Sequence, residues 1–125
     1  MSKYKINIWE RAFELSVVYE CYPGEEVMKS QKEAFDMLKA NMAAIVESLE
    51  AVKKYVRKSG SAQLSDDSID NIFKYVMPKS IFVPHDKKHH TVAIICNYKL
   101  DMEHGLAVIF ENGKFKKVGT QDIVL

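Results

Sequence analysis

The stretch FDMLKANMAAIVESLEAVKKYVRK, residues 35–58, carries the strongest structural signal in this chain of 125 residues. Its apolar residues recur at intervals of 3, 4, 3, 4, 3 and 4 positions, which places them on one stripe of a helix. Ala34, Val46 and Tyr55 flank this stripe and widen it. We therefore expect the stripe to pack on the protein's own core, the alternative being the seam of a coiled-coil dimer. Its members are Phe35, Leu38, Met42, Ile45, Leu49, Val52 and Val56.

The signals around the stripe predict where the helix begins and ends. Ser30 and Glu33 have the spacing of a capping box, and Ser59-Gly60 is typical of a helix end. One helix over residues 31–58 would be roughly 40 Å long, which leaves two alternatives, a single long helix or a helix pair with a break near residues 39–41. The helix dipole accounts for the basic residues of the last two turns without a ligand. These are Lys53, Lys54, Arg57 and Lys58.

Two alternating segments precede the helix and predict an N-terminal hairpin. Tyr4, Ile6 and Ile8 alternate with polar residues, and the same period of two continues through Phe13, Leu15, Val17 and Tyr19. Trp9 is interpreted as part of the core or its rim, the alternative being an exposed ring, because the residue falls on the polar phase of its strand. Pro23-Gly24 ends the strand pattern.

The second half of the chain predicts a short helix followed by four strands. Ser65 or Asp66 can cap the helix, and Pro78 ends it. Its apolar residues are Ile69, Ile72, Phe73 and Val76. The strands are expected at residues 80–83, 91–98, 106–110 and 114–118. Asn112-Gly113 predicts a tight antiparallel hairpin between the last two strands.

This order of elements predicts an α+β fold, with residues 1–125 forming a single domain. We expect a mostly antiparallel sheet built from the N-terminal hairpin and a C-terminal four-strand meander. The long helix, or a helix pair, and the short helix should pack on one face of it.

Composition excludes several classes of function. The formal net charge is +1, which gives no field to attract DNA or RNA, so we expect no nucleic-acid partner. Cys21 and Cys96 lack the spacing of a disulfide framework or zinc site and are interpreted as buried, reduced thiols. The N-terminus has no signal-peptide pattern and no run is long enough to span a membrane. These observations favour a cytoplasmic protein without a membrane association or a cofactor.

The segment LDMEHG, residues 100–105, is the one candidate site in the sequence, since Asp101, Glu103 and His104 could act together. A histidine beside carboxylates can serve as a general base. In an extended segment, however, residues 101 and 103 point away from residue 104, and the sequence shows no convincing nucleophile. The chemically simpler interpretation is a turn, in which Gly105 permits an unusual φ and Asp101 caps the backbone.

A metal site is a second interpretation of the same residues. His85, His89, His90 and His104, together with Asp86, Asp101 and Glu103, supply enough donors for zinc or a similar ion. The segment 85–90 also reads as an exposed polar loop whose lysines, Lys87 and Lys88, would repel a cation. We therefore expect no metal ligands among these residues.

Several short motifs resemble a group of small bacterial proteins. These proteins share a D-x-E-H-G hairpin, a further strand and a closing G-x-Q-D, which correspond here to residues 101–105 and to Gly119-Thr120-Gln121-Asp122. The helix start, with Gln31 and Ala34, is similar to the group's Q-x-x-A. Leu100 stands where the group commonly has an aromatic residue.

The group is mostly a domain of unknown function, and related domains look like immunity proteins of bacterial toxin systems. The resemblance, together with the lack of a persuasive catalytic set, favours a small bacterial protein that binds another protein, a toxin or a second copy of itself, over an enzyme. The alternative is a metal-binding protein or a small hydrolase that uses Asp101, Glu103 and His104. The oligomeric state is left open.

Overall fold

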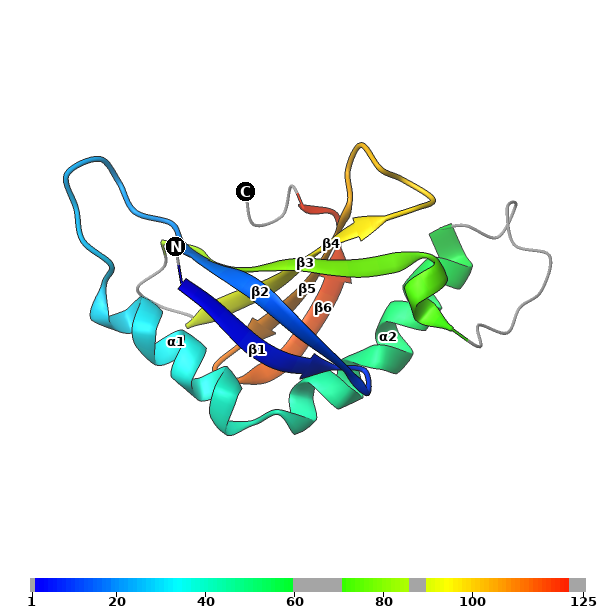
Figure 1. The fold of residues 1–125 in the computed structure, drawn as a ribbon, viewed down its shortest axis with the longest axis horizontal. Helices are drawn as coiled ribbons and strands as arrows, with labels where there is room; N and C mark the ends of the chain where they lie inside the picture. The colour runs from blue at the N-terminus through cyan, green and yellow to red at the C-terminus, as the bar shows by residue number, and fades with distance from the viewer. Residues whose placement is uncertain (1, 60–70, 86–89, 122–125) are drawn as a thin grey trace.

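The computed structural model describes residues 2–59, 71–85 and 90–121. The described strands form one six-stranded sheet, and their order across the sheet follows their order along the chain. Figure 1 shows the two helices following one another along one side of this sheet. The predicted α+β class is confirmed. The strands are β1 (Ser2–Ile8), β2 (Arg11–Tyr19), β3 (Val76–Val83), β4 (Thr91–Tyr98), β5 (Leu106–Glu111) and β6 (Lys114–Gly119), and the helices are α1 (Lys29–Ala40), α2 (Ala43–Ser59) and a 3-10 turn, η1 (Ile72–Lys74).

The sheet is mixed rather than antiparallel throughout. β1 pairs antiparallel with β2, and β3 to β6 form the predicted antiparallel meander. β2 and β3 run parallel, with Val18 opposite Phe82. Both helices lie between these two strands in the chain, so β3 enters the sheet in the direction of β2. The predicted hairpin and meander are thus joined into one sheet.

The N-terminal hairpin turns tightly at Trp9 and Glu10. Ile8 pairs with Arg11, and the two residues between them have φ of 52° and 68°, as in a type I′ turn. Trp9 is only 5% exposed, and its Nε1 donates a hydrogen bond to Ser48 Oγ of α2 at 3.2 Å. Trp9 therefore belongs to the core and the alternative of an exposed ring is wrong, because the residue lies in the turn and its left-handed backbone directs the ring toward α2.

The chain forms a helix pair, one of the two alternatives that the sequence left open, and the helix start differs from the prediction. α1 ends at Ala40, and Asn41 Nδ2 donates to the Gly113 carbonyl at 2.8 Å, which fixes the break to the β5–β6 turn. The helix begins at Lys29, so Ser30 lies inside it and is not the cap. Gln31 Oε1, in place of Glu33, accepts from the Met28 amide at 2.9 Å.

The apolar stripe packs on the sheet of the same chain, as expected. Five of its members are buried, and Met42 and Leu49 are half-buried against the same core. Val46 is 67% exposed, so its predicted place on the core-facing surface is wrong. It lies on the helix surface that faces away from the sheet. The buried members are Phe35, Leu38, Ile45, Val52 and Val56.

The region before the meander is less helical than predicted. Residues 65, 66 and 69, which include both predicted caps, lie outside the described residues. Val76 already belongs to β3, which therefore starts four residues before the predicted strand at 80–83. Pro78 lies within β3 at an irregularity, where the register shifts between Pro78 and Ser80. A bulge is one of the few sheet positions that proline tolerates, so it does not end an element here.

The meander itself follows the prediction closely. β4 has the predicted bounds, and β5 and β6 each extend one residue further. Asn112 and Gly113 have φ of 55° and 77°, which confirms the predicted tight turn. A Cβ at Gly113 would lie 2.7 Å from the Met37 carbonyl oxygen of α1, so the close approach of helix and turn also requires glycine.

The central strands are apolar on both faces. The main core fills the space between the helices and the sheet. A smaller buried cluster lies on the opposite face, which explains why the central strands are continuous apolar runs rather than alternating ones. Its members are Phe82, Ala93, Ile95, Ala107 and Ile109.

The two cysteines are free, and only one of them is fully buried. Cys96 lies in the main core, where burial raises the pKa of its thiol. Cys21 is half-buried, so the prediction of two buried thiols holds for Cys96 alone. Among the described residues, the helices are too short or too polar for one to cross a lipid bilayer.

Candidate functional site

The segment Asp101-Met102-Glu103-His104-Gly105, named here the DMEHG turn, forms a closed turn between β4 and β5. The Gly105 amide donates to the Asp101 carbonyl at 2.9 Å. The His104 amide and its Nδ1 both approach the Asp101 carboxylate, at 3.3 and 3.0 Å. The turn thus reverses the chain within five residues and brings together two side chains that an extended segment would separate.

Of the three predicted site residues, the turn pairs two. Asp101 and His104 form a hydrogen-bonded pair on the surface, with side chains 40% and 48% exposed. Hydrogen bonding to His104 lowers the pKa of the Asp101 carboxyl. Glu103 is exposed at the tip of the turn, next to Met102. An aspartate that orients a histidine is the arrangement of a general base, and here it lies on an exposed turn.

Gly105 and Gln121 connect the turn to the end of β6. The Gln121 amide donates to the His104 carbonyl at 3.1 Å, and Gln121 Nε2 donates to the Cys96 carbonyl at 3.0 Å. Gly105 has φ of 64°, and a Cβ there would lie 2.2 Å from Gln121 Nε2. The glycine and the glutamine of the two motifs are therefore in contact, and that contact has a structural reason.

Gln31, from the third motif, is likewise engaged in holding the fold. It is 1% exposed and lies in the first turn of α1. Its Nε2 donates to the carbonyls of Glu20 and Val83, at 2.8 and 3.2 Å, while its Oε1 accepts from Met28. One amide therefore ties the start of α1 to the ends of both parallel strands.

The described histidines of the predicted metal site lie with different carboxylates. His85 Nε2 is 3.2 Å from Glu25, and His90 Nε2 is 3.3 Å from Glu33, while His104 pairs with Asp101. His89 and Asp86 lie outside the described residues. In the ranges 2–59, 71–85 and 90–121, three or more potential ligands do not come together at any point. The ring of His85 also packs against Tyr22, with centroids 4.1 Å apart.

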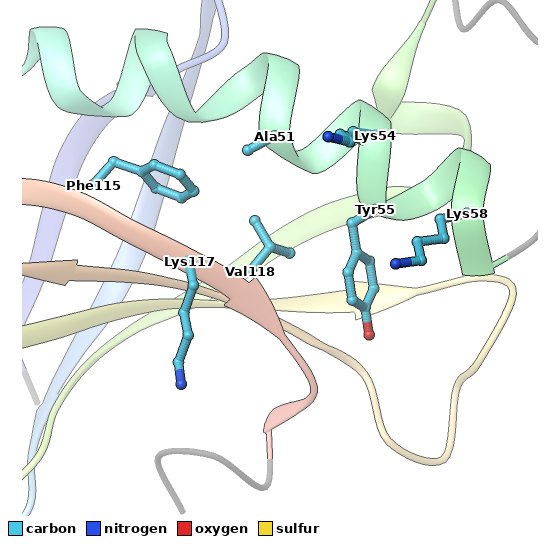
Figure 2. Close-up of a pocket in the computed structure, with 7 residues that line it drawn as sticks. All are labelled: Ala51, Lys54, Tyr55, Lys58, Phe115, Lys117 and Val118. Atoms are coloured by element: carbon cyan, nitrogen blue, oxygen red, sulfur yellow. The ribbon is translucent and has the colours of Figure 1, made fainter.

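A hollow of about 300 Å³ lies between α2 and β6, and we call it the α2–β6 hollow. Its apolar wall is made by half-buried side chains from both elements. Figure 2 shows Phe115 and Val118 of β6 turned toward Ala51 of α2, with the ring of Tyr55 beside them. Seven residues line it, namely Ala51, Lys54, Tyr55, Lys58, Phe115, Lys117 and Val118.

Three lysines surround the apolar wall. Lys54 and Lys58 project from consecutive turns of α2, whereas the ammonium group of Lys117 points away from the helix, toward the other side of β6 (Figure 2). All three are exposed, and none of them forms an ion pair with another described residue. Partial burial raises the pKa of Tyr55, and the charge of Asp101 adds to this effect. The DMEHG turn thus lies near one end of the hollow.

Sequence reasoning missed this hollow. Lys54 and Lys58 were assigned to the helix dipole, and Phe115 and Val118 to an ordinary strand. The i, i+4 spacing of the two lysines beside Tyr55 was the only local signal. The apolar wall exists only once residues about 60 positions apart are brought together, so no single window of sequence contains it.

Fold and site together define a class, a small α+β protein with one mixed sheet, two helices on one face and a lysine-bordered hollow at the last strand. The chain matches a domain of unknown function, DUF6985, over residues 1–125, and so belongs to that family. Searches of the curated proteins and of the solved structures found no match.

Proposed function

We propose that this chain is a non-enzymatic, protein-binding module of the immunity-like kind, and that the α2–β6 hollow is its contact surface. The observation that carries the proposal is the combination of an apolar wall with three lysines that form no ion pair with the described residues. Apolar area supplies binding free energy, and charges at the rim select the partner and speed its association. The partner is accordingly an acidic protein surface with apolar side chains at its centre.

The surroundings of the hollow support this charge preference. The chain as a whole is nearly neutral, with 18 basic and 17 acidic residues, so an acidic partner is attracted by local rather than net charge. Lys39, Lys29 and Lys116, by contrast, lie beside Asp36, Glu33 and Glu111. The resemblance to immunity-like proteins supports a toxin as the partner.

The test is a binding measurement with the product of the gene adjacent to this one, using calorimetry and growth rescue on co-expression. We expect a stoichiometric complex that the charge-reversal variant K54E/K58E/K117E weakens by roughly tenfold or more. The matched control K3E/K32E/K79E carries the same net charge on other exposed lysines and should bind normally. A complex that neither variant affects, or that both weaken equally, would remove the hollow as the contact surface, and the absence of both complex and rescue would remove this partner.

The alternative function, metal binding or hydrolysis, rests on the Asp101 and His104 pair at 3.0 Å. The pair does not line the α2–β6 hollow, and Glu103 does not extend it into a set of three ligands or catalytic groups. A turnover that His104→Ala abolishes, or a stoichiometric metal ion in the purified chain, would favour this alternative over protein binding.

A further inference from the structure

The two edges of the sheet differ in how their inner side is filled. At the β1 edge, Ile6 and Ile8 are buried, and the Tyr4 ring contacts Phe35 of α1 edge-on, with centroids 5.3 Å apart. Lys39 Nζ lies 4.7 Å from the centre of the Phe35 ring and closes the same corner. Phe35 and Lys39 of α1 therefore cover the inner side of β1 at Tyr4, although β1, like β6, is an edge strand that pairs on one side only.

The β6 edge is open in the described part of the chain. β6 is the last strand in the sheet order and pairs with β5 on one side only. Alternate residues of an edge strand direct their N–H and C=O groups outward, where they can pair with another strand. No described side chain hydrogen-bonds to these groups. The α2–β6 hollow lies along this edge, so α2 covers the space beside β6, and none of the described residues fills it.

From this geometry we infer that the partner binds by adding an extended segment to β6 as a seventh strand, with apolar side chains facing the hollow and acidic side chains facing Lys117. The inference rests on the proposed function and specifies how the same surface is used. Side chains of an added strand alternate between the two sides of the sheet. The apolar side chains of the added strand would pack against the apolar wall of the hollow, next to Lys54 and Lys58. Its acidic side chains would lie on the side of the sheet to which Lys117 points (Figure 2). Main-chain pairing then gives affinity, and the alternation gives specificity.

The sequence and register of β6 favour pairing with one kind of segment over pairing with any exposed strand. Its register shifts between Ile109 and Phe110, so that Ile109 pairs with Lys117, Phe110 pairs with Phe115, and Lys116 is left out of the ladder. Bulges and lysines on an edge strand prevent pairing with like strands. An edge with Lys114, Lys116 and Lys117 therefore repels a second copy of itself and admits an acidic segment.

The experiment is an NMR titration of the full chain with an eight-residue peptide in which Glu alternates with Val or Leu. Two matched peptides accompany it, one with the four Glu residues in a single block and one with the alternating sequence N-methylated at every second amide. We expect the alternating peptide to shift the signals of α2 and β6 and to slow hydrogen exchange in β6 but not in β1. N-methylation on the edge-facing amides should weaken binding by roughly tenfold or more, because each blocked amide removes a strand hydrogen bond.

The outcomes separate the two proposals. Suppose that the peptide with its Glu residues in one block and the N-methylated peptide both bind as well as the alternating one, and that the K54E/K58E/K117E variant abolishes all binding. The hollow then binds acidic segments, but strand addition is wrong. If none of the acidic peptides shifts the signals of α2 or β6 in the unchanged chain, the strand addition is overturned, and the proposed contact surface loses its support as well. Protection of β1 amides in place of β6 would also overturn the inference.

Discussion

The DMEHG turn and the α2–β6 hollow lie close together, and they illustrate opposite relations between sequence and role. The turn collects acid, imidazole and glycine within five residues, yet its polar groups bond mainly to one another and to Gln121. The hollow is built from ordinary helix and strand residues, yet its lysines form no ion pair with another described residue. The residues that stand out in the sequence therefore stabilise the fold. The proposed binding surface, the α2–β6 hollow, is made by residues from distant segments of the chain.

If the motif residues are structural, the largest loss of stability should come from Gln31. The change Gln31→Met keeps the volume but removes the donors to the Glu20 and Val83 carbonyls and the acceptor for Met28. Leaving these groups unpaired should lower the free energy of unfolding by about 3 kcal/mol. Urea denaturation measures this, with Lys32→Met on the exposed neighbouring position as the control. Equal stabilities of the two variants would contradict the structural role.

The second largest effect should be at Gly105. Gly105→Ala forces a left-handed backbone on alanine and pushes Gln121 away from Cys96, so we expect a loss of about 2 kcal/mol. Gly24→Ala is the matched control, because Gly24 has φ of 82° with nothing within 4 Å of the new Cβ. It should lose only about half as much. Removing the clash in Gly105→Ala/Gln121→Ala should cost less than the sum of the single changes, and strict additivity would show that the contact is unimportant.

A smaller effect is expected in acid. The pKa of Asp101 is lowered in the folded chain, so its contribution to stability is present above pH 3.8, the ordinary value, and is lost as the pH falls through the lowered folded pKa. Asp101→Asn should therefore lower the free energy of unfolding at neutral pH and make it depend less on pH in the acid range. Glu103→Gln, in the same turn, is the control. If the free energy of unfolding of the Asp101 variant falls in acid as steeply as that of the unchanged chain, the contact between Asp101 and His104 contributes nothing to stability.

The sequence predicted the regular elements well and their assembly less well. The stripe from Phe35 to Val56 and the Asn112-Gly113 turn depend on local periodicity and local backbone preference, and both are confirmed. Whether the helix breaks near residue 40 was left open by the sequence. The parallel pairing of β2 with β3 is a tertiary property that no local pattern encodes. The contact of Trp9 with α2 could not be predicted for a related reason, because its partner Ser48 is 39 residues away.

The sequence was sufficient to predict that the DMEHG segment forms a turn, but not which residues the turn contacts. Gly105 and Asp101 indicated a turn from the residue types alone. The contact of Gln121 with Gly105 depends on β6 returning beside β5, which only the fold shows. The hollow was invisible for the same reason, since its helix and strand residues each had a sufficient local explanation.

The most direct test of the division between turn and hollow is the NMR titration with the alternating acidic peptide, applied to His104→Ala and to K54E/K58E/K117E. If recognition belongs to the hollow, His104→Ala should bind within about twofold of the unchanged chain, with the same shifts in α2 and β6, and the triple variant should lose about tenfold or more in affinity. Loss of binding in His104→Ala with full binding in the triple variant would contradict the account and assign recognition to the DMEHG turn.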